Sequence, residues 1–139
     1  MVDVGLTHVA LPVKDVNASI AFYEKYAKMK VVHRRTDPVD GHSVVWLGDY
    51  TRPFVIVFIE VENVDTHLKP LAHLGVGCES RDEVDRLAKE ARAEDCLIDG
   101  PADDGHPVGY WLFLRDPDGH TLELSFGQEI GLVVQESKD

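Results

Sequence analysis

The stretch FLRDPDGHTLELSF, Phe113–Phe126, has the pattern of two strands joined by a tight turn. The turn is DPDG, residues 116–119, in which proline suits the second position and glycine the last. Side chains alternate across a strand, so Glu123 should point to the face opposite Leu122 and Leu124. A buried charge is normally paired with another charge or bound to a metal. The stretch therefore predicts a hairpin that carries a carboxylate in need of a partner.

The composition predicts one domain with a real core, since 44% of the 139 residues are hydrophobic. A net charge of -11 disfavours nucleic acid and anionic membrane surfaces as partners, because both attract basic proteins. The two cysteines are too few for a disulfide framework. The sequence shows no run long enough to span a membrane and no secretory signal at its start. We therefore expect a cytoplasmic protein with a small-molecule substrate.

The same succession of elements occurs twice along the chain. A strand at Leu6–Val13 precedes a helix with Asp15 as its N-cap, and three strand-like segments follow. A strand at Ala72–Ser80 precedes a helix that opens with the capping-box pair Ser80 and Glu83, and three more strands follow. The pattern predicts an α+β fold of two tandem β-α-β-β-β modules. We place module one at 4–62, a linker at 63–71, module two at 72–127 and a weak, partly charged tail at 128–139.

The two halves can be superposed by residue number. An offset of 65 puts His8 on His73 and Trp46 on Trp111, and one inserted residue later Val57 falls on Glu123. This indicates a duplicated unit with histidine-bearing strands in the same register.

Strand alternation places His8, His73 and Glu123 on the face opposite the main apolar packing face, and Gly75 and Gly77 leave that face open. Two histidines and a carboxylate suit one divalent metal ion with open positions for water or substrate, and Fe, Mn, Zn and Ni all fit these ligands. The alternative is that each histidine is a satisfied core residue. The repeat favours the metal, because it gives the two histidines equivalent positions.

Three motifs carry a family resemblance: THVALPVKDVNASIAFY at 7–23, AHLGVGCES at 72–80 and FLRDPDGHTLELSF at 113–126. With them the chain resembles the vicinal oxygen chelate superfamily, which includes glyoxalase I, extradiol dioxygenases, fosfomycin-resistance enzymes and bleomycin-resistance proteins. The resemblance implies a half-closed mixed sheet around a metal, with His8, His73 and Glu123 at the ligand positions. It also implies a homodimer, with the modules paired within one chain or exchanged across the dimer.

One position departs from the glyoxalase I pattern. There a fourth ligand, also a glutamate, comes from the last strand of module one, where this chain has Val57. Its same-face neighbours Val55 and Ile59 are also apolar, which favours a three-ligand site with an apolar wall. The resemblance then implies a substrate whose adjacent oxygens chelate the metal, with an aromatic or alkyl group against the wall.

Other residues allow two interpretations. Tyr110 is a candidate catalytic residue that could hydrogen-bond a metal-bound oxygen, or a strand tyrosine with a packed ring. His106 is a candidate general acid or base, or a solvated loop histidine. We expect Trp46 and Trp111 to pack between sheet and helix or in a subunit contact, and His33 to be a surface residue. The rival function is a metal-free protein of the bleomycin-resistance type that sequesters a planar, often cationic ligand.

Overall fold

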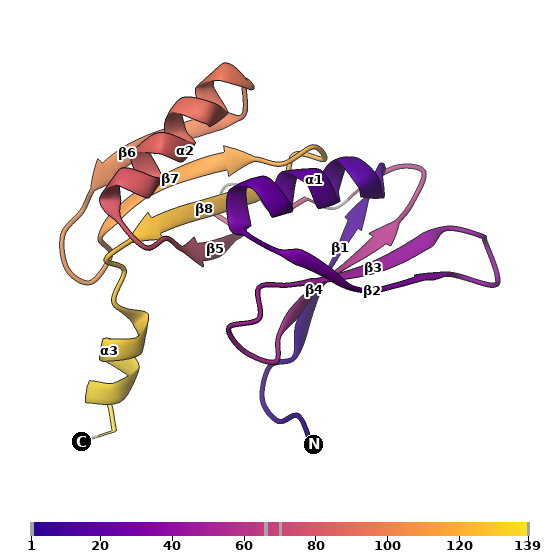
Figure 1. Ribbon diagram of the computed structural model, residues 1–139, viewed down its shortest axis with the longest axis horizontal. Helices are drawn as coiled ribbons and strands as arrows, with labels where there is room; N and C mark the ends of the chain where they lie inside the picture. The colour runs from indigo at the N-terminus through magenta and orange to yellow at the C-terminus, as the bar shows by residue number, and fades with distance from the viewer. Residues whose placement is uncertain (1, 66, 70, 139) are drawn as a thin grey trace. The chain divides into compact units, whose positions relative to one another are not determined.

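The computed structural model describes residues 2–65, 67–69 and 71–138. The chain divides into two compact units, residues 1–67 (unit 1) and residues 68–139 (unit 2). Each unit contains a four-stranded mixed sheet and a helix that follows its first strand (Figure 1). This confirms the α+β class and the two β-α-β-β-β modules. The boundary between the units lies inside the segment 63–71 that we expect to be the linker.

Unit 1 consists of β1 (His8–Val13), α1 (Val16–Ala27), β2 (Lys30–Thr36), β3 (Ser43–Gly48) and β4 (Val55–Glu60). The strand order is β1-β4-β3-β2, with β1 parallel to β4 and the other pairs antiparallel. The carboxylate of Asp15 accepts hydrogen bonds from the backbone N–H groups of Asn17 and Ala18, so the predicted N-cap begins α1. Tyr23 of α1 packs on Phe58 of β4 in the fully buried core.

Unit 2 consists of β5 (His73–Gly77), α2 (Arg81–Ala93), β6 (Leu97–Asp103), β7 (Tyr110–Arg115), β8 (Thr121–Phe126) and α3 (Ile130–Glu136). Its strand order is β5-β8-β7-β6, with β5 parallel to β8. The Ser80 hydroxyl accepts a hydrogen bond from the Glu83 N–H at the start of α2, as predicted. The Glu83 carboxylate accepts one from the Glu79 N–H, one residue before the position that a capping box uses.

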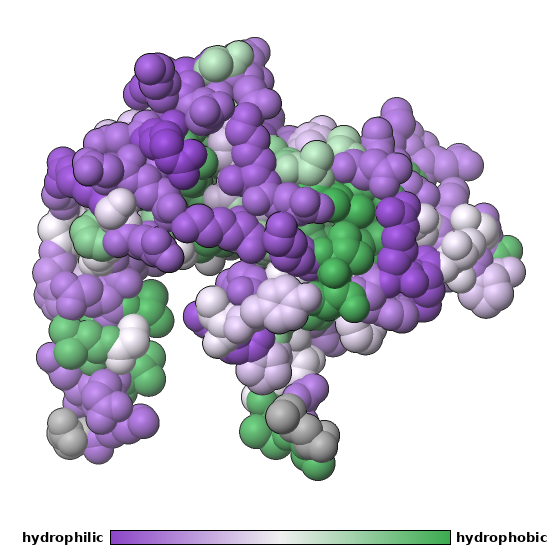
Figure 2. Space-filling model, in the orientation of Figure 1, coloured by the Kyte–Doolittle hydropathy of each residue, from purple (hydrophilic) through white to green (hydrophobic). Residues whose placement is uncertain are grey.

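The C-terminal tail forms a helix where the sequence pattern suggests only a weak extension. No residue of α3 is buried, and its apolar side chains lie on the surface (Figure 2). They are Ile130, Leu132, Val133 and Val134. Among the described residues, no helix has the length and apolar character needed to cross a membrane.

Strand pairing tests the internal repeat directly. His8 lies opposite Val55 in the first sheet, and His73 lies opposite Thr121 in the second. Val57 and Glu123 are therefore each two residues beyond the histidine's partner, which confirms that they are equivalent.

The predicted match of Trp46 with Trp111 is wrong. Trp46 lies opposite Val57, whereas Phe113 lies opposite Glu123, so Trp46 corresponds to Phe113. The offset between the modules rises from 65 at the histidines to 67 here, and it is 66 at Val57 and Glu123. Corresponding loops of the two modules differ slightly in length, so the residue offset between the modules changes from one strand to the next.

Candidate functional site

Glu123 and His73 meet on the face of the second sheet that points away from α2. The Glu123 side chain lies on β8 with only 7% of the residue exposed, and Gly75 of β5 lies directly opposite it. His73 Nε2 is 3.8 Å from Glu123 Oε1. A Cβ atom at Gly75 or Gly77 would meet nothing within 4 Å among the described residues, so the glycines leave this face open.

The His73 ring is fixed by a backbone contact. Its Nδ1 lies 3.1 Å from the carbonyl oxygen of Leu71. A carbonyl can only accept, so Nδ1 carries the proton. In the neutral ring, Nε2 then presents a lone pair toward Glu123. Metal-binding histidines usually have this arrangement, in which the second ring nitrogen donates to a carbonyl or a carboxylate.

The second oxygen of Glu123 is held by Gln128. The Gln128 amide donates to Glu123 Oε2 at 3.4 Å and to the carbonyl oxygen of Val108 at 3.3 Å. These long contacts are weak partners for a carboxylate that is nearly buried. A divalent cation fits the donor set, because 3.8 Å between His73 Nε2 and Glu123 Oε1 is less than twice a usual metal–ligand bond of about 2.1 Å.

His8 lies on β1 in unit 1, at the edge of a pocket in that unit. Its Nδ1 is 2.9 Å from the Thr7 hydroxyl, and its Nε2 has no hydrogen bond in the described part of the chain. Both predicted histidine ligands therefore have one ring nitrogen engaged and the other unengaged by hydrogen bonding. The structure brings His73 and Glu123 together. Within residues 2–65, 67–69 and 71–138 it gathers no group of three His, Cys, Asp or Glu side chains that could hold a metal.

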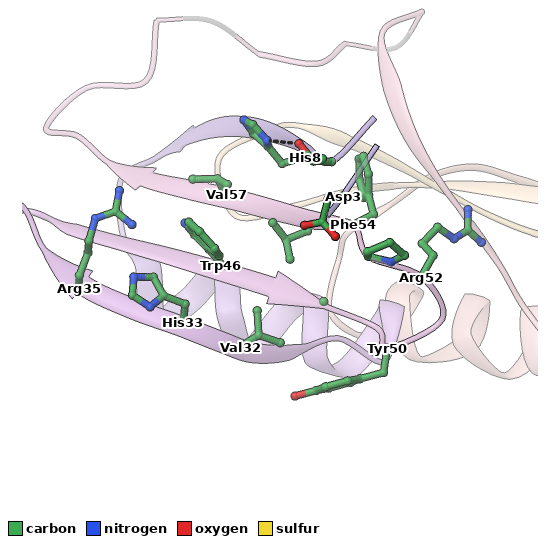
Figure 3. A pocket seen from close by; sticks show the side chains of 14 residues that line it. Asp3, His8, Val32, His33, Arg35, Trp46, Tyr50, Arg52, Phe54 and Val57 are labelled. Atoms are coloured by element: carbon green, nitrogen blue, oxygen red, sulfur yellow. Dashed lines mark hydrogen bonds between the residues drawn. The ribbon is translucent and has the colours of Figure 1, made fainter. Parts of the chain in front are cut away.

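The pocket in unit 1 has a volume of about 690 Å³ and lies on the face of the sheet away from α1 (Figure 3). His8, Val57, Trp46 and His33 follow one another across the four strands in the view of Figure 3. Of the predicted apolar wall, Val55 and Val57 line the pocket. The remaining lining residues are Asp3, Thr7, Val32, Arg35, Gly48, Tyr50, Arg52, Pro53 and Phe54.

Trp46 and His33 occupy places that the sequence does not predict. Trp46 is 37% exposed and lines the pocket instead of packing between sheet and helix, with the His33 ring 4.8 Å away. Trp46 faces the pocket because it lies opposite Val57, which also lines it. His33 comes beside Trp46 through a β-bulge in β2: Val31 lies opposite Leu47 but His33 lies opposite Trp46, so one residue is inserted between them. The bulge directs Val32, His33 and Arg35 toward the pocket, and simple alternation cannot show it.

Trp111 does not pack between its sheet and α2 either. It lies opposite Ser125, on the Glu123 face of the second sheet and away from α2. Its indole N–H donates to Asp104 at 2.9 Å. Neither tryptophan therefore packs between a sheet and its helix.

Tyr110 lies on the other face of the second sheet from Glu123. It pairs with Phe126, whereas Glu123 pairs with Phe113, and residues an odd number apart point to opposite faces. The Tyr110 hydroxyl donates to the Asp85 carboxylate, which raises the pKa of Tyr110 because the bond favours the neutral phenol. The Arg81 guanidinium lies 3.9 Å from the centre of the ring. The structure therefore gives Tyr110 partners on α2 and does not bring it to Glu123.

His106 lies in the loop between β6 and β7. Its Nδ1 is 3.3 Å from Glu129 Oε1, and both side chains are largely exposed. The Glu129 N–H donates to the carbonyl oxygen of Pro107 at 3.0 Å, so this loop is tied to the segment before α3. These contacts join His106 to Glu129 and not to Glu123.

Known proteins resemble this chain along most of its length. The uncharacterized protein PA2024 of Pseudomonas aeruginosa is 40% identical over 131 residues, which cover 91% of either chain. The lactoylglutathione lyase GLX1 of Arabidopsis thaliana is 29% identical over 126 residues. That match covers 84% of this chain but only 42% of the plant protein, so the chain spans less than half of its length.

Solved structures show the same fold. A mutant of the fosfomycin resistance protein FosX from Listeria monocytogenes, complexed with Mn(II) and 1S,2S-dihydroxypropylphosphonic acid, has a TM-score of 0.72 at 19% identity. It matches 96% of this chain and 99% of its own. Glyoxalase I of Leishmania major has a TM-score of 0.71 at 24% identity, with 97% of this chain and 95% of its own covered.

The strongest assignment comes from a family model that matches residues 5–124. This range includes both modules as far as Leu124, and with it His8, His73 and Glu123. The chain therefore belongs to the Glyoxalase/Bleomycin resistance protein/Dioxygenase superfamily, a vicinal oxygen chelate family.

Proposed function

We propose that the protein is a divalent-metal-dependent enzyme of the glyoxalase/dioxygenase type whose metal is held by His8, His73 and Glu123. Its substrate is a small molecule with two adjacent oxygens that chelate the metal. The observation that supports this best is the position of His73 Nε2, 3.8 Å from the nearly buried Glu123 carboxylate. A cation between two such electron-rich atoms would turn repulsion into coordination.

The chain's own residues would prepare this site. Leu71 fixes the tautomer of His73, Gln128 holds the outer oxygen of Glu123, and Thr7 contacts Nδ1 of His8. The open face over Gly75 and Gly77 leaves room for a substrate. A divalent ion bound there would supply Lewis-acid polarisation of substrate oxygens or activation of dioxygen.

The ligand set favours some branches of the family over others. Val57 stands at the position equivalent to Glu123, so module one contributes no carboxylate there. Two histidines with one carboxylate form the facial set of non-haem Fe(II) oxygenases, and Mn(II), Zn(II) and Ni(II) also fit. Ring cleavage, isomerisation and addition are all compatible with it. We further propose a cytoplasmic homodimer, on the strength of the family resemblance.

Metal analysis tests the proposal. Protein stripped with EDTA and reloaded anaerobically with Fe(II), Mn(II), Zn(II) or Ni(II) should retain about one ion per chain, measured by plasma mass spectrometry. Each reloaded form is then offered a catechol, an α-ketoaldehyde thiol adduct and an epoxide, with oxygen uptake and product followed. Less than about a tenth of an ion per chain after reloading would favour a metal-free binding protein instead.

Gln128 provides a finer prediction for the same site. Gln128→Leu should weaken divalent metal binding about tenfold, because outer partners of a ligand typically affect metal affinity by about that factor or more. The substitution removes the hydrogen bond from the Gln128 amide that orients the Glu123 carboxylate. Titration with Mn(II), followed by electron paramagnetic resonance, measures it. Gln135→Leu on exposed α3 is the matched control and should bind as the unaltered protein does. Equal affinities for the two variants would contradict a role for Gln128.

A further inference from the structure

The pocket in unit 1 has the size and apolar lining of a ligand site. Its volume of about 690 Å³ falls within the usual range of small-molecule pockets, about 300–1,000 Å³. Trp46, Val55 and Val57 form a continuous apolar floor on neighbouring strands, since Trp46 lies directly opposite Val57. This floor suits a flat, apolar group more than a hydrated one.

Trp46 is exposed at the centre of this floor. Its indole is flanked by the His33 ring at 4.8 Å and the Arg35 guanidinium at 5.9 Å, as Figure 3 shows. A large aromatic side chain with 37% of the residue exposed still has apolar surface to bury. A planar ligand could cover this surface by stacking.

Arginines line the pocket of an otherwise acidic chain. The whole protein carries a net charge of -11, yet Arg35 and Arg52 line the pocket with one acid, Asp3, and Asp49 interacts with the charge of Arg52. Arg35 has no ion pair in the described part of the chain, and its guanidinium lies over the Trp46 ring. A guanidinium without a carboxylate partner can bind an anion through two parallel hydrogen bonds.

Arg34, the neighbouring residue, shows how specific this placement is. It lies opposite Val45 on the α1 face, and its guanidinium donates to Asn17 of α1 at 3.3 Å. The two adjacent arginines therefore point to opposite sides of β2, and Arg35 is the one that lines the pocket.

From these features we infer that the unit 1 pocket binds a small organic anion with a planar apolar body, which stacks on Trp46 while its anionic group meets Arg35. The inference rests on the proposed function in that this anion would be the substrate, since His8 lines the same pocket. It also distinguishes the pocket from a site for the planar cations expected of a sequestering protein, because the Arg35 guanidinium beside Trp46 would repel them.

Binding of simple probes tests the inference in EDTA, without metal. The Trp111→Phe protein leaves Trp46 as its single tryptophan, so Trp46 fluorescence reports the pocket. Phenylacetate should quench it saturably. The neutral 2-phenylethanol and the ring-free acetate should bind at least about fivefold more weakly, and phenethylamine more weakly still. Phenethylamine binding as tightly as phenylacetate would overturn the inference, and so would the absence of saturable phenylacetate binding.

Matched variants locate the anionic contact. Arg35→Gln should weaken phenylacetate binding about fivefold or more and leave 2-phenylethanol unchanged, whereas Arg34→Gln should change neither. Trp46→Leu, measured by calorimetry, should weaken both aromatic probes. Equal effects of the Arg34 and Arg35 substitutions would overturn the assignment.

The outcome is separable from that of the metal analysis. Phenylacetate binding with no bound metal would leave the pocket assignment standing and remove the proposed enzyme. Stoichiometric metal binding without phenylacetate binding would leave the proposed metal site standing and remove the pocket assignment.

Discussion

We expect His73→Ala to bind less than about a tenth of a divalent ion per chain under conditions in which the unaltered protein binds about one. The substitution removes the Nε2 donor that lies 3.8 Å from Glu123 Oε1. It leaves at most two protein ligands, too few for a site that must hold an ion against water and chelators. Plasma mass spectrometry of the reloaded variant measures the loss, and any metal-dependent turnover should disappear with it.

A matched control separates ligand loss from general damage. His42 lies in the turn between β2 and β3, where its Nδ1 is 3.6 Å from an Asp40 carboxylate oxygen. His42→Ala removes one imidazole of the same kind and should retain about one ion per chain. Circular dichroism of His73→Ala should match that of the unaltered protein, because His73 is exposed at the sheet surface. Stoichiometric metal in a folded His73→Ala protein would contradict the ligand assignment.

The orientation of Glu123 could be predicted because it depends on local rules alone. Strand alternation opposes Glu123 to Leu122 and Leu124, and the structure buries both leucines fully on the helix side. Helix starts at Asp15 and Ser80 were predictable for the same reason, since a capping side chain acts within three residues. The equivalence of Val57 and Glu123 follows from the repeat, because the matched histidines and one inserted residue are enough to align the two strands.

Features that depend on loop lengths or on strand irregularities escaped prediction. The bulge after Val31 places His33 and Arg35 around Trp46, and no pattern of residues in the sequence predicts this bulge. The mismatch of Trp46 with Trp111 has a different cause. Loops of different length change the residue offset between the two modules by one or two positions.

The contacts of Tyr110 could be predicted only in part. Alternation alone would have placed Tyr110 on the other face of the sheet from Glu123, since the hairpin pairs Tyr110 with Phe126. Its contact with Asp85, however, depends on how α2 packs against β7, which is a tertiary property. Two of the three proposed ligands meet because parallel strands β5 and β8 are neighbours in space, although 50 positions separate His73 from Glu123. That neighbourhood follows from the family fold and not from local pattern.

Glu123→Val should abolish metal binding and make the metal-free protein more stable. Module one provides the precedent, because Val57 occupies the equivalent position in the same strand register. In the absence of metal, the Glu123 carboxylate has, among the described residues, only the contacts with His73 and Gln128, both longer than a strong hydrogen bond. Burying a polar group without a good hydrogen bond costs about 1–3 kcal/mol in protein mutational data, so the apolar side chain should stabilise the metal-free protein by about 1 kcal/mol or more. Urea unfolding in EDTA measures the gain.

The metal should reverse the order of stability. A saturating divalent ion stabilises only the folded protein that binds it, by about 2.7 kcal/mol at a concentration a hundred times its Kd. Mn(II) should therefore raise the urea midpoint of the unaltered protein and leave Glu123→Val unchanged. Glu123→Gln serves as the comparison: it also loses the metal, but its amide can donate to the free Nε2 of His73, so it tests polarity separately from charge. If Glu123→Val were instead less stable than the unaltered protein in EDTA, His73 and Glu123 would form a stabilising ion pair, and the carboxylate would need no metal to explain its burial.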